Sequence, residues 1–216
     1  ALLTSILSNG KENSFHFHII ATGISDRQKS EIVMYVNGRQ SEITFYDIDQ
    51  ELVERFVLSG KWTPAVYYRL FFPLLIPNDI TRILYLDSDT IVVGDLTELY
   101  LESTNGYPVG AVYDNYVKKQ ERIGIIEEGN YFNSGVLLID LVAWRSQQIS
   151  EKAIEYLQEH PENIIFVDQC ALNAVLIRKW KKLPERYNLL YSYVPPMLGR
   201  RAMKEYIKDK LVIHYT

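Results

Sequence analysis

Cysteine is nearly missing from this sequence, which contains only Cys170 among its 216 residues. A single cysteine excludes a disulfide within the chain, and we expect a cytoplasmic, reducing compartment. A basic charge excess is also missing: the net charge is −4, which argues against a nucleic-acid partner. Long apolar runs are missing as well, since the longest, 70–76, contains Pro73 and is too short to cross a membrane.

The composition that remains is that of an ordinary globular protein. Hydrophobic residues make up 47% of the chain and charged residues 23%, which is enough to build one sizeable core. With no internal repeat and no low-complexity linker, we expect residues 1–216 to form a single domain. The first seven residues lack an initiating Met and the basic start of a signal peptide, so we expect the natural chain to begin earlier.

Predicted strands and helices alternate along most of the sequence. Apolar and β-branched runs predict strands at 15–22, 42–48, 83–86, 91–93, 108–113, 132–140, 180–184, 188–194 and 211–215. Helical periodicity and capping residues, including Ser25, predict helices at 1–8, 25–37, 51–58, 64–76, 96–101, 141–145, 151–159, 169–176 and 201–208. This alternation favours an α/β fold with a Rossmann-like, mostly parallel central sheet covered by helices.

Two carboxylates follow the strand predicted at 83–86. Asp87 and Asp89 are separated only by Ser88. If the strand continued through them, both side chains would lie on one face at its carboxyl end, where α/β sheets bind ligands. Two neighbouring anions suit a hard divalent cation. The alternative is an Asp-rich turn with no ligand.

Three further groups of polar residues could share this site. His214 ends the last predicted strand, and one imidazole with two carboxylates suits Mn²⁺ or Mg²⁺. Asn133 and Ser134 precede a strong strand, although they also suit a plain turn. Asp168 is positioned to cap the helix at 169–176, a role that leaves Gln169 unexplained.

These segments together resemble glycosyltransferase family 8, a family of retaining enzymes that includes bacterial lipopolysaccharide galactosyl- and glucosyltransferases. The resemblance runs in the family's order over nearly the whole chain. It rests on Tyr68-Arg69-Leu70, Ile83-Leu-Tyr-Leu-Asp-Ser-Asp89, Tyr131-Phe-Asn-Ser-Gly-Val-Leu-Leu-Ile-Asp140, Trp144-Arg145, Asp168-Gln169, Leu183-Pro184, Tyr187-Asn188 and Ile213-His214-Tyr215.

The resemblance implies a GT-A-type domain that transfers glucose or galactose from a UDP-sugar to a saccharide or glycan acceptor such as lipopolysaccharide. It implies that Asp87, Asp89 and His214 bind Mn²⁺ or Mg²⁺, and that Asp87, Ser88 and Asp89 contact the nucleotide. It places Arg69, Asp114, Asn133 and Ser134 around the donor sugar, with Asp168 and Gln169 as the catalytic pair. It also implies a cytoplasmic enzyme at the inner face of the membrane, attached peripherally through a tail outside this sequence.

Retention of the sugar's configuration leaves two mechanisms open. A covalent intermediate needs a nucleophile, and the amide of Gln169 is a poor one. We therefore favour same-face attack, with the leaving phosphate accepting the acceptor's proton. The transition state would resemble an oxocarbenium ion, which a nearby carboxylate or amide oxygen stabilises.

This sequence departs from the family's pattern in two respects. Cys170 stands where family members often have a third polar residue, Asp, and this change could alter the donor preference. The family's first strand and its Gly-x-x-Lys-Pro-Trp segment lie beyond the two ends of this chain. We expect the nucleotide pocket of residues 1–216 to be incomplete.

Three alternatives remain. Asp87-Ser-Asp89 is similar to the nucleophile loop of haloacid-dehalogenase-type phosphatases, although that loop normally follows the first strand of the chain. A catalytically silent sugar-nucleotide or glycan-binding domain is a second alternative, and a scaffold with a vestigial site is a third. The number of intact polar residues argues against the scaffold.

Overall fold

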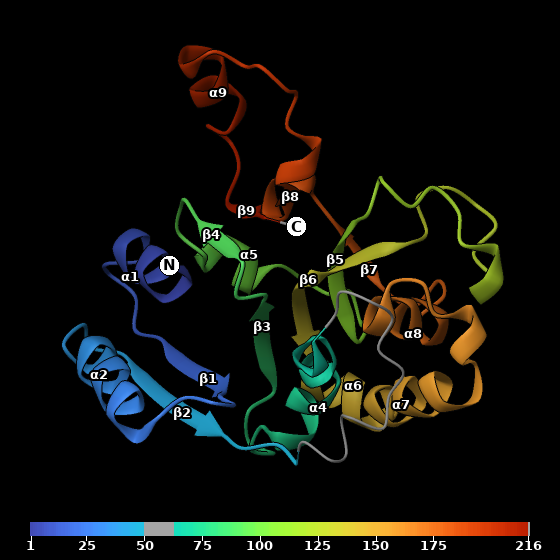
Figure 1. The fold of residues 1–216 in the computed structure, drawn as a ribbon, viewed down its shortest axis with the longest axis horizontal. Helices are drawn as coiled ribbons and strands as arrows, with labels where there is room; N and C mark the ends of the chain where they lie inside the picture. The colour runs from blue at the N-terminus through green and yellow to red at the C-terminus, as the bar shows by residue number, and fades with distance from the viewer. Residues whose placement is uncertain (50–62, 216) are drawn as a thin grey trace.

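The structure is a computed structural model that describes residues 1–49 and 63–215. It has the predicted α/β architecture, with three sheets surrounded by helices (Figure 1). The predicted helix at 51–58 lies outside the described residues. Strands are β1 His16–Ile20, β2 Glu42–Tyr46, β3 Arg82–Leu86, β4 Thr90–Val92, β5 Val109–Tyr113, β6 Phe132–Asp140, β7 Lys181–Leu183, β8 Leu189–Leu190 and β9 Val212–His214.

The helices occupy most of the positions predicted from sequence. They are α1 Leu2–Asn9, α2 Asp26–Asn37, α4 Tyr68–Leu75, α5 Thr97–Leu101, α6 Leu141–Ser146, α7 Ile149–Glu159, α8 Val167–Val175 and α9 Arg200–Tyr206. Ser25 caps α2 as predicted, in a reciprocal capping box with Gln28. Short 3₁₀ turns η1 to η5 cover Pro64–Tyr67, Glu121–Ile123, Pro161–Asn163, Glu185–Tyr187 and Tyr191–Tyr193.

The prediction of a mostly parallel central sheet is wrong. The central sheet has the order β3-β6-β5-β7, and β6 runs antiparallel to both β3 and β5, while β5 and β7 are parallel. The chain passes from β5 to β6 through the irregular segment 114–131 and not through a crossover helix, so β6 is free to return antiparallel. Two smaller sheets, β1-β2 and β4-β9-β8, flank the central one.

Strand β6 lies at the centre of the core because both of its faces are buried. Leu137 and Ile139 pack on one face with Tyr67 of η1, Trp144 of α6 and residues of the helices α4, α7 and α8. Val136 and Leu138 pack on the other face against side chains from α1, α5 and β9. Strand β3 is only half-buried, since it forms an edge of the described sheet.

No helix in the described ranges has the length and apolarity that would let it cross a membrane. The longest described helix is α2, with 12 residues, and a membrane span needs about 20 apolar residues.

Arg145 joins α6 to the end of α4, the helix that carries Arg69. Its guanidinium donates to the backbone oxygens of Ile76 at 2.7 Å and of Pro73, Pro77 and Ile80 at 3.2 Å each. The Pro73 carbonyl lies in the last turn of α4 and the other three follow it, where intrahelical donors run out. Arg145 therefore fixes where α4 ends and β3 begins.

We predict that Arg145→Ala lowers the free energy of unfolding by about 2–3 kcal/mol, because four carbonyls lose a charged donor. Urea denaturation followed by circular dichroism measures this. Arg200→Ala, at an exposed position on α9, is the control, with an expected change within about 0.5 kcal/mol. Equal effects of the two substitutions would show that the Arg145 contacts contribute nothing specific.

Candidate active site

Asp87, Asp89 and His214 converge as predicted. One ligand atom from each lies within 4.8 Å of the other two. His214 Nε2 is 3.2 Å from Asp89 Oδ1 and 3.7 Å from Asp87 Oδ2. The geometry that produces this convergence differs from the prediction, since β3 ends at Leu86 and the two aspartates lie in a turn that leads into β4.

Backbone hydrogen bonds hold the three groups in place. Thr90 pairs with His214 across the antiparallel strands β4 and β9, and the Tyr215 amide donates to the Asp89 carbonyl at 3.0 Å. The Asp87 amide donates to the Gly135 carbonyl on β6 at 2.8 Å. Three sheet elements that lie far apart in sequence therefore determine the position of this group.

Gly135 leaves the space in which His214 sits. A Cβ atom at this position would lie 2.1 Å from His214 Cε1 and 2.9 Å from Asp87 Oδ2. Contacts this short do not occur between real atoms, so any side chain at Gly135 would displace the imidazole. Glycine is thus required at position 135 because the imidazole of His214 and the carboxylate of Asp87 lie close to the backbone there.

Tyr85 is a site residue that the sequence reasoning missed. Its hydroxyl donates to Asp87 Oδ1 at 2.7 Å, and burial raises the pKa of Tyr85 well above its usual value, which keeps the phenol protonated. Residues two apart on a strand share a face, so the spacing of Tyr85 and Asp87 could have revealed the pair. Oδ1 of Asp87 is engaged in this way, while Oδ2 faces His214.

Arg69 lies between the carboxylates of Asp87 and Asp168. Its Nη2 is 3.0 Å from Asp87 Oδ1, its Nε is 2.8 Å from Asp168 Oδ2, and its Nη1 donates to the backbone oxygen of Ser134 at 2.6 Å. Burial would lower the pKa of Arg69, but the charges of Asp168 and Asp87 outweigh burial and raise it. The buried guanidinium therefore has a carboxylate partner on each side.

Asp168 does not cap a helix, and that prediction is wrong. Helix α8 begins at Val167 after Phe166, and Asp168 lies in its first turn with its side chain directed at Arg69. Ser134 Oγ also donates to Asp168 Oδ2, at 3.2 Å. Burial raises the pKa of Asp168 to about 6, against the opposing charge of Arg69.

Gln169 and Asp114 extend this network away from the aspartate turn. Gln169 Oε1 accepts from the Ser134 amide at 3.0 Å, and its Nε2 donates to Asp114 Oδ2 at 3.1 Å. Asn133 Nδ2 also points to Asp114 Oδ2, at 3.4 Å, and the Tyr193 hydroxyl donates to Asp114 Oδ1 at 2.9 Å. Sequence reasoning did not select Tyr193, and no local motif marks it.

The structure thus brings together all the predicted polar residues, and Ser88 lies between the two aspartates with its side chain exposed in the turn. Cys170 lies elsewhere: its side chain is fully buried with Val117, Ile123, Ile125 and Tyr131. Its Sγ lies 3.4 Å from the Tyr131 hydroxyl and accepts from the Phe166 amide at 3.2 Å. Cys170 therefore supports the segment 114–131 and does not line the site.

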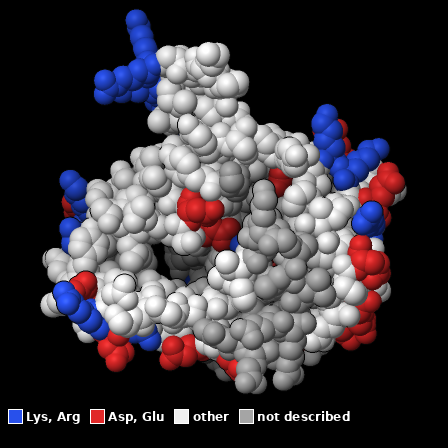
Figure 2. All heavy atoms as spheres, in the orientation of Figure 1, with Lys and Arg blue, Asp and Glu red and all other residues white. Residues whose placement is uncertain are grey.

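A large cavity of about 1690 Å³ opens at the aspartate turn. It runs between β1 and β3, and its walls include Arg69, Tyr85, Asp87, Ser88 and Asp89. The hollow is visible beside acidic side chains in Figure 2. A pocket or cavity of 300–1,000 Å³ commonly holds a small ligand, so there is room for one larger than a monosaccharide.

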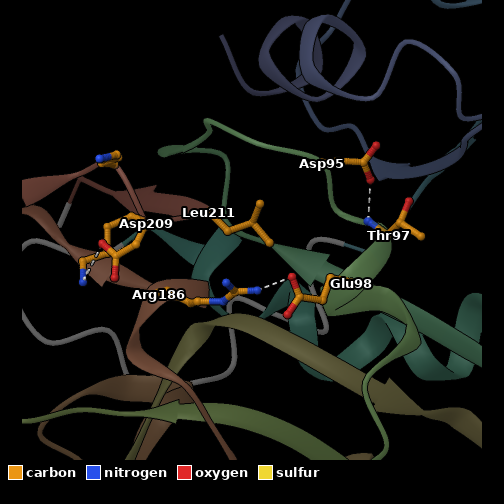
Figure 3. Close-up of a pocket in the computed structure, with 8 residues that line it drawn as sticks. Asp95, Thr97, Glu98, Arg186, Asp209 and Leu211 are labelled. Atoms are coloured by element: carbon orange, nitrogen blue, oxygen red, sulfur yellow. Dashed lines mark hydrogen bonds and ion pairs between the residues drawn. The ribbon is translucent and has the colours of Figure 1, made fainter. Parts of the chain in front are cut away.

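A second cavity, of about 570 Å³, contains none of the predicted site residues. Figure 3 shows its walls, in which Arg186 pairs with Glu98, and the Thr97 amide donates to Asp95 at 2.7 Å. Because these polar groups satisfy one another, this cavity has no evident chemical role.

The group at Asp87, Asp89 and His214 fits a divalent cation. Two carboxylate oxygens and one imidazole nitrogen face one another, a donor set suited to Mn²⁺ and acceptable to Mg²⁺. Burial opposes ionisation of Asp89, but its hydrogen bond to His214 and the charge of that residue lower the pKa of Asp89. Asp89 is therefore ionised and able to act as a ligand at neutral pH.

Comparisons with known proteins agree with this arrangement. The sequence model of Glycosyl transferase family 8 matches residues 1–216. General stress protein A of Bacillus subtilis (strain 168) is 32% identical over 225 residues, which cover 99% of this chain and 79% of that protein. Lipopolysaccharide 1,2-glucosyltransferase of Escherichia coli (strain K12) is 30% identical over 222 residues, which cover 99% of this chain and 65% of that protein.

Among solved structures, galactosyltransferase LgtC in complex with donor and acceptor sugar analogues superposes with a TM-score of 0.84. It is 26% identical, and the match covers 99% of this chain and 80% of LgtC. The structure of LgtC with an active-site Gln→Glu substitution gives the same TM-score at 25% identity. The likeness to LgtC confirms the predicted GT-A-type fold.

We predict that Gly135→Ala abolishes Mn²⁺ binding, because the added methyl group displaces His214. Titration of free Mn²⁺ by electron paramagnetic resonance measures binding directly. Gly110→Ala is the matched control: its Cβ would meet only the Leu183 side chain, at 3.2 Å, so Mn²⁺ binding should persist. Retention of wild-type Mn²⁺ affinity in Gly135→Ala would show that His214 is not a ligand.

Proposed function

This chain belongs to glycosyltransferase family 8, and on that basis we propose that it is a metal-dependent, retaining hexosyltransferase. The donor would be a UDP-sugar carrying glucose or galactose, and the acceptor a saccharide or glycan such as lipopolysaccharide. Membership of this family rules out the phosphatase alternative, in which Asp87 would be a nucleophile. The lipopolysaccharide 1,2-glucosyltransferase of Escherichia coli (strain K12) and galactosyltransferase LgtC each match this chain over 99% of its length.

The observation that carries the proposal is the continuity between two groups of polar residues. Asp87 belongs to the cation-binding group, and Asp168 begins the network that reaches Gln169 and Asp114. Arg69 bonds to both carboxylates, at 3.0 Å and 2.8 Å. A sugar diphosphate needs two such neighbouring sites, one for its phosphates and one for its sugar.

Asp87, Asp89 and His214 would hold Mn²⁺ or Mg²⁺. When bound, the cation would neutralise the negative charge that develops on the departing diphosphate. The guanidinium of Arg69 adds a fixed positive charge beside the same place, and such preorganised charges stabilise a transition state without reorganisation. Asp87 and Asp89 also border the cavity of about 1690 Å³, in which we place the nucleotide.

Asp168, Asn133 and Ser134 would position the donor sugar. The carboxylate of Asp168 is held by Arg69 and Ser134 and can accept hydrogen bonds from sugar hydroxyls. Asp114 would contribute in the same way from the end of β5, where Gln169 and Tyr193 hold its carboxylate.

Gln169 would lie beneath the reacting carbon and stabilise positive charge on it. Its Oε1 accepts from the Ser134 amide and Oγ, so the side chain is fixed by hydrogen bonds and is a poor nucleophile. Same-face attack then follows. The bond from C1 to the phosphate oxygen breaks with its electron pair going to phosphate, the acceptor oxygen bonds to C1 on the same face, and its proton passes to the phosphate oxygen.

LgtC, which has the same fold, also has a glutamine in its active site, and we propose Gln169 as its counterpart. Trapping of a covalent sugar adduct on Asp168 or Gln169, followed by mass spectrometry, would contradict same-face attack. We place the reaction on the cytoplasmic side of the membrane, where the single unpaired cysteine is expected to remain reduced.

We predict that UDP is released from UDP-glucose or UDP-galactose in the presence of Mn²⁺ and that EDTA abolishes the release. Asp89→Ala should lower the rate about 100-fold or more, because one charged ligand of the cation is lost. A coupled assay for UDP across a panel of UDP-sugars measures this and identifies the donor.

Asp209→Ala, at an exposed acidic position between α9 and β9, should leave the rate within about twofold of wild type. Full activity in EDTA would contradict the role of the cation. Binding of UDP and Mn²⁺ by calorimetry, without turnover of any UDP-sugar, would instead favour the silent binding domain.

A further inference from the structure

The segment between β8 and β9 projects from the body of the molecule. It leaves the site at Tyr191, forms η5 and α9, and returns at Leu211 (Figure 1). None of the twenty residues 191–210 is buried. We refer to residues 194–210 as the projecting lobe.

The projecting lobe is basic, whereas the chain as a whole is acidic. It contains five Lys or Arg and two Asp or Glu residues, a net charge of +3 in a chain of net charge −4. Lys208 pairs with Glu205, and Lys210 with Asp209. In the described part of the chain, Arg200, Arg201 and Lys204 form no ion pair, and all three are exposed. Figure 2 shows this basic cluster at the tip, with no acidic side chain beside it on that face.

The projecting lobe also carries an exposed apolar side chain. Met197 is fully exposed, at 101% of its reference area, and follows the exposed residues Pro195 and Pro196. Its backbone is left-handed, with φ of 67°, a conformation that is uncommon for methionine. An exposed apolar side chain on the same lobe as unpaired cations suits binding at the polar–apolar boundary of an anionic bilayer.

We propose that the projecting lobe docks this protein on an anionic phospholipid surface. The lobe carries +3 and the remainder of the chain therefore −7, so an anionic membrane attracts the lobe and repels the body. This asymmetry also sets the orientation, with Arg200, Arg201 and Lys204 facing the headgroups, while Met197 adds an apolar contact with the bilayer.

The lobe is joined directly to the candidate active site. Leu190, which precedes it, pairs with His214 in the parallel strands β8 and β9. The Tyr193 hydroxyl at its base donates to Asp114 at 2.9 Å. Docking through the lobe would therefore hold the site at the membrane surface, where a lipid-linked glycan is presented. Binding to lipid does not depend on the proposed sugar transfer and can be measured without it.

The test is co-sedimentation of the whole chain with vesicles of phosphatidylcholine alone or mixed with phosphatidylglycerol. We expect binding only to the anionic vesicles, loss of binding at high salt, and about tenfold or greater weakening in Arg200→Glu/Arg201→Glu. Acidic residues suit the first turn of α9, so this variant should fold, as circular dichroism can verify. Met197→Asn, which tolerates the left-handed backbone, should also weaken binding.

The matched control is Lys118→Glu/Lys119→Glu, which makes the same charge change at two adjacent exposed lysines outside the lobe. This control should keep more than about half of the wild-type binding. The proposal is overturned if wild type ignores anionic vesicles, if both double variants lose binding equally, or if light scattering shows that Arg200→Glu/Arg201→Glu instead dissociates a complex between copies of the chain.

Discussion

The guanidinium of Arg69 is the group on which the site depends. A buried cation is stable only when it is paired and hydrogen-bonded, and Arg69 meets that requirement with two carboxylates and the backbone of Ser134. Its partners come from the turn after β3, from β6 and from α8. These elements must therefore assemble around one charge, and removing any partner would leave the others without compensation.

The position of strand β6 is the second constraint on the site. Strand β6 contributes Asn133, Ser134 and Gly135 at the end where it borders β3 and β5. The register of β5 against β6 shifts at Ala111/Val112, just before the strand reaches these residues, and such irregularities often re-aim side chains at functional sites. Because both faces of β6 are buried, these polar groups are supported on a rigid strand.

The sequence predicted the positions of the strands and helices and the residues of the site better than it predicted the directions of the strands. Apolar runs and caps located most strands and helices, and family resemblance located the residues of the site. Strand direction was wrong because alternation suggested crossover helices, whereas β5 and β6 are joined by an irregular segment. Asp168 was misassigned because a capping residue and a first-turn carboxylate look alike in sequence. Tyr193 and the carbonyl contacts of Arg145 depend on tertiary packing that no local pattern encodes, whereas Tyr85 could have been found from its spacing to Asp87.

The burial of Cys170 has a practical consequence. It is the only thiol in the chain, has no exposed area, and lies beneath Val117, Ile123 and Ile125 of the segment 114–131. A thiol-reactive reagent can therefore reach it only when that segment separates from α8. The rate of alkylation reports how often this happens, and the ratio of rates with and without a bound sugar would give the free energy by which a ligand holds the segment closed.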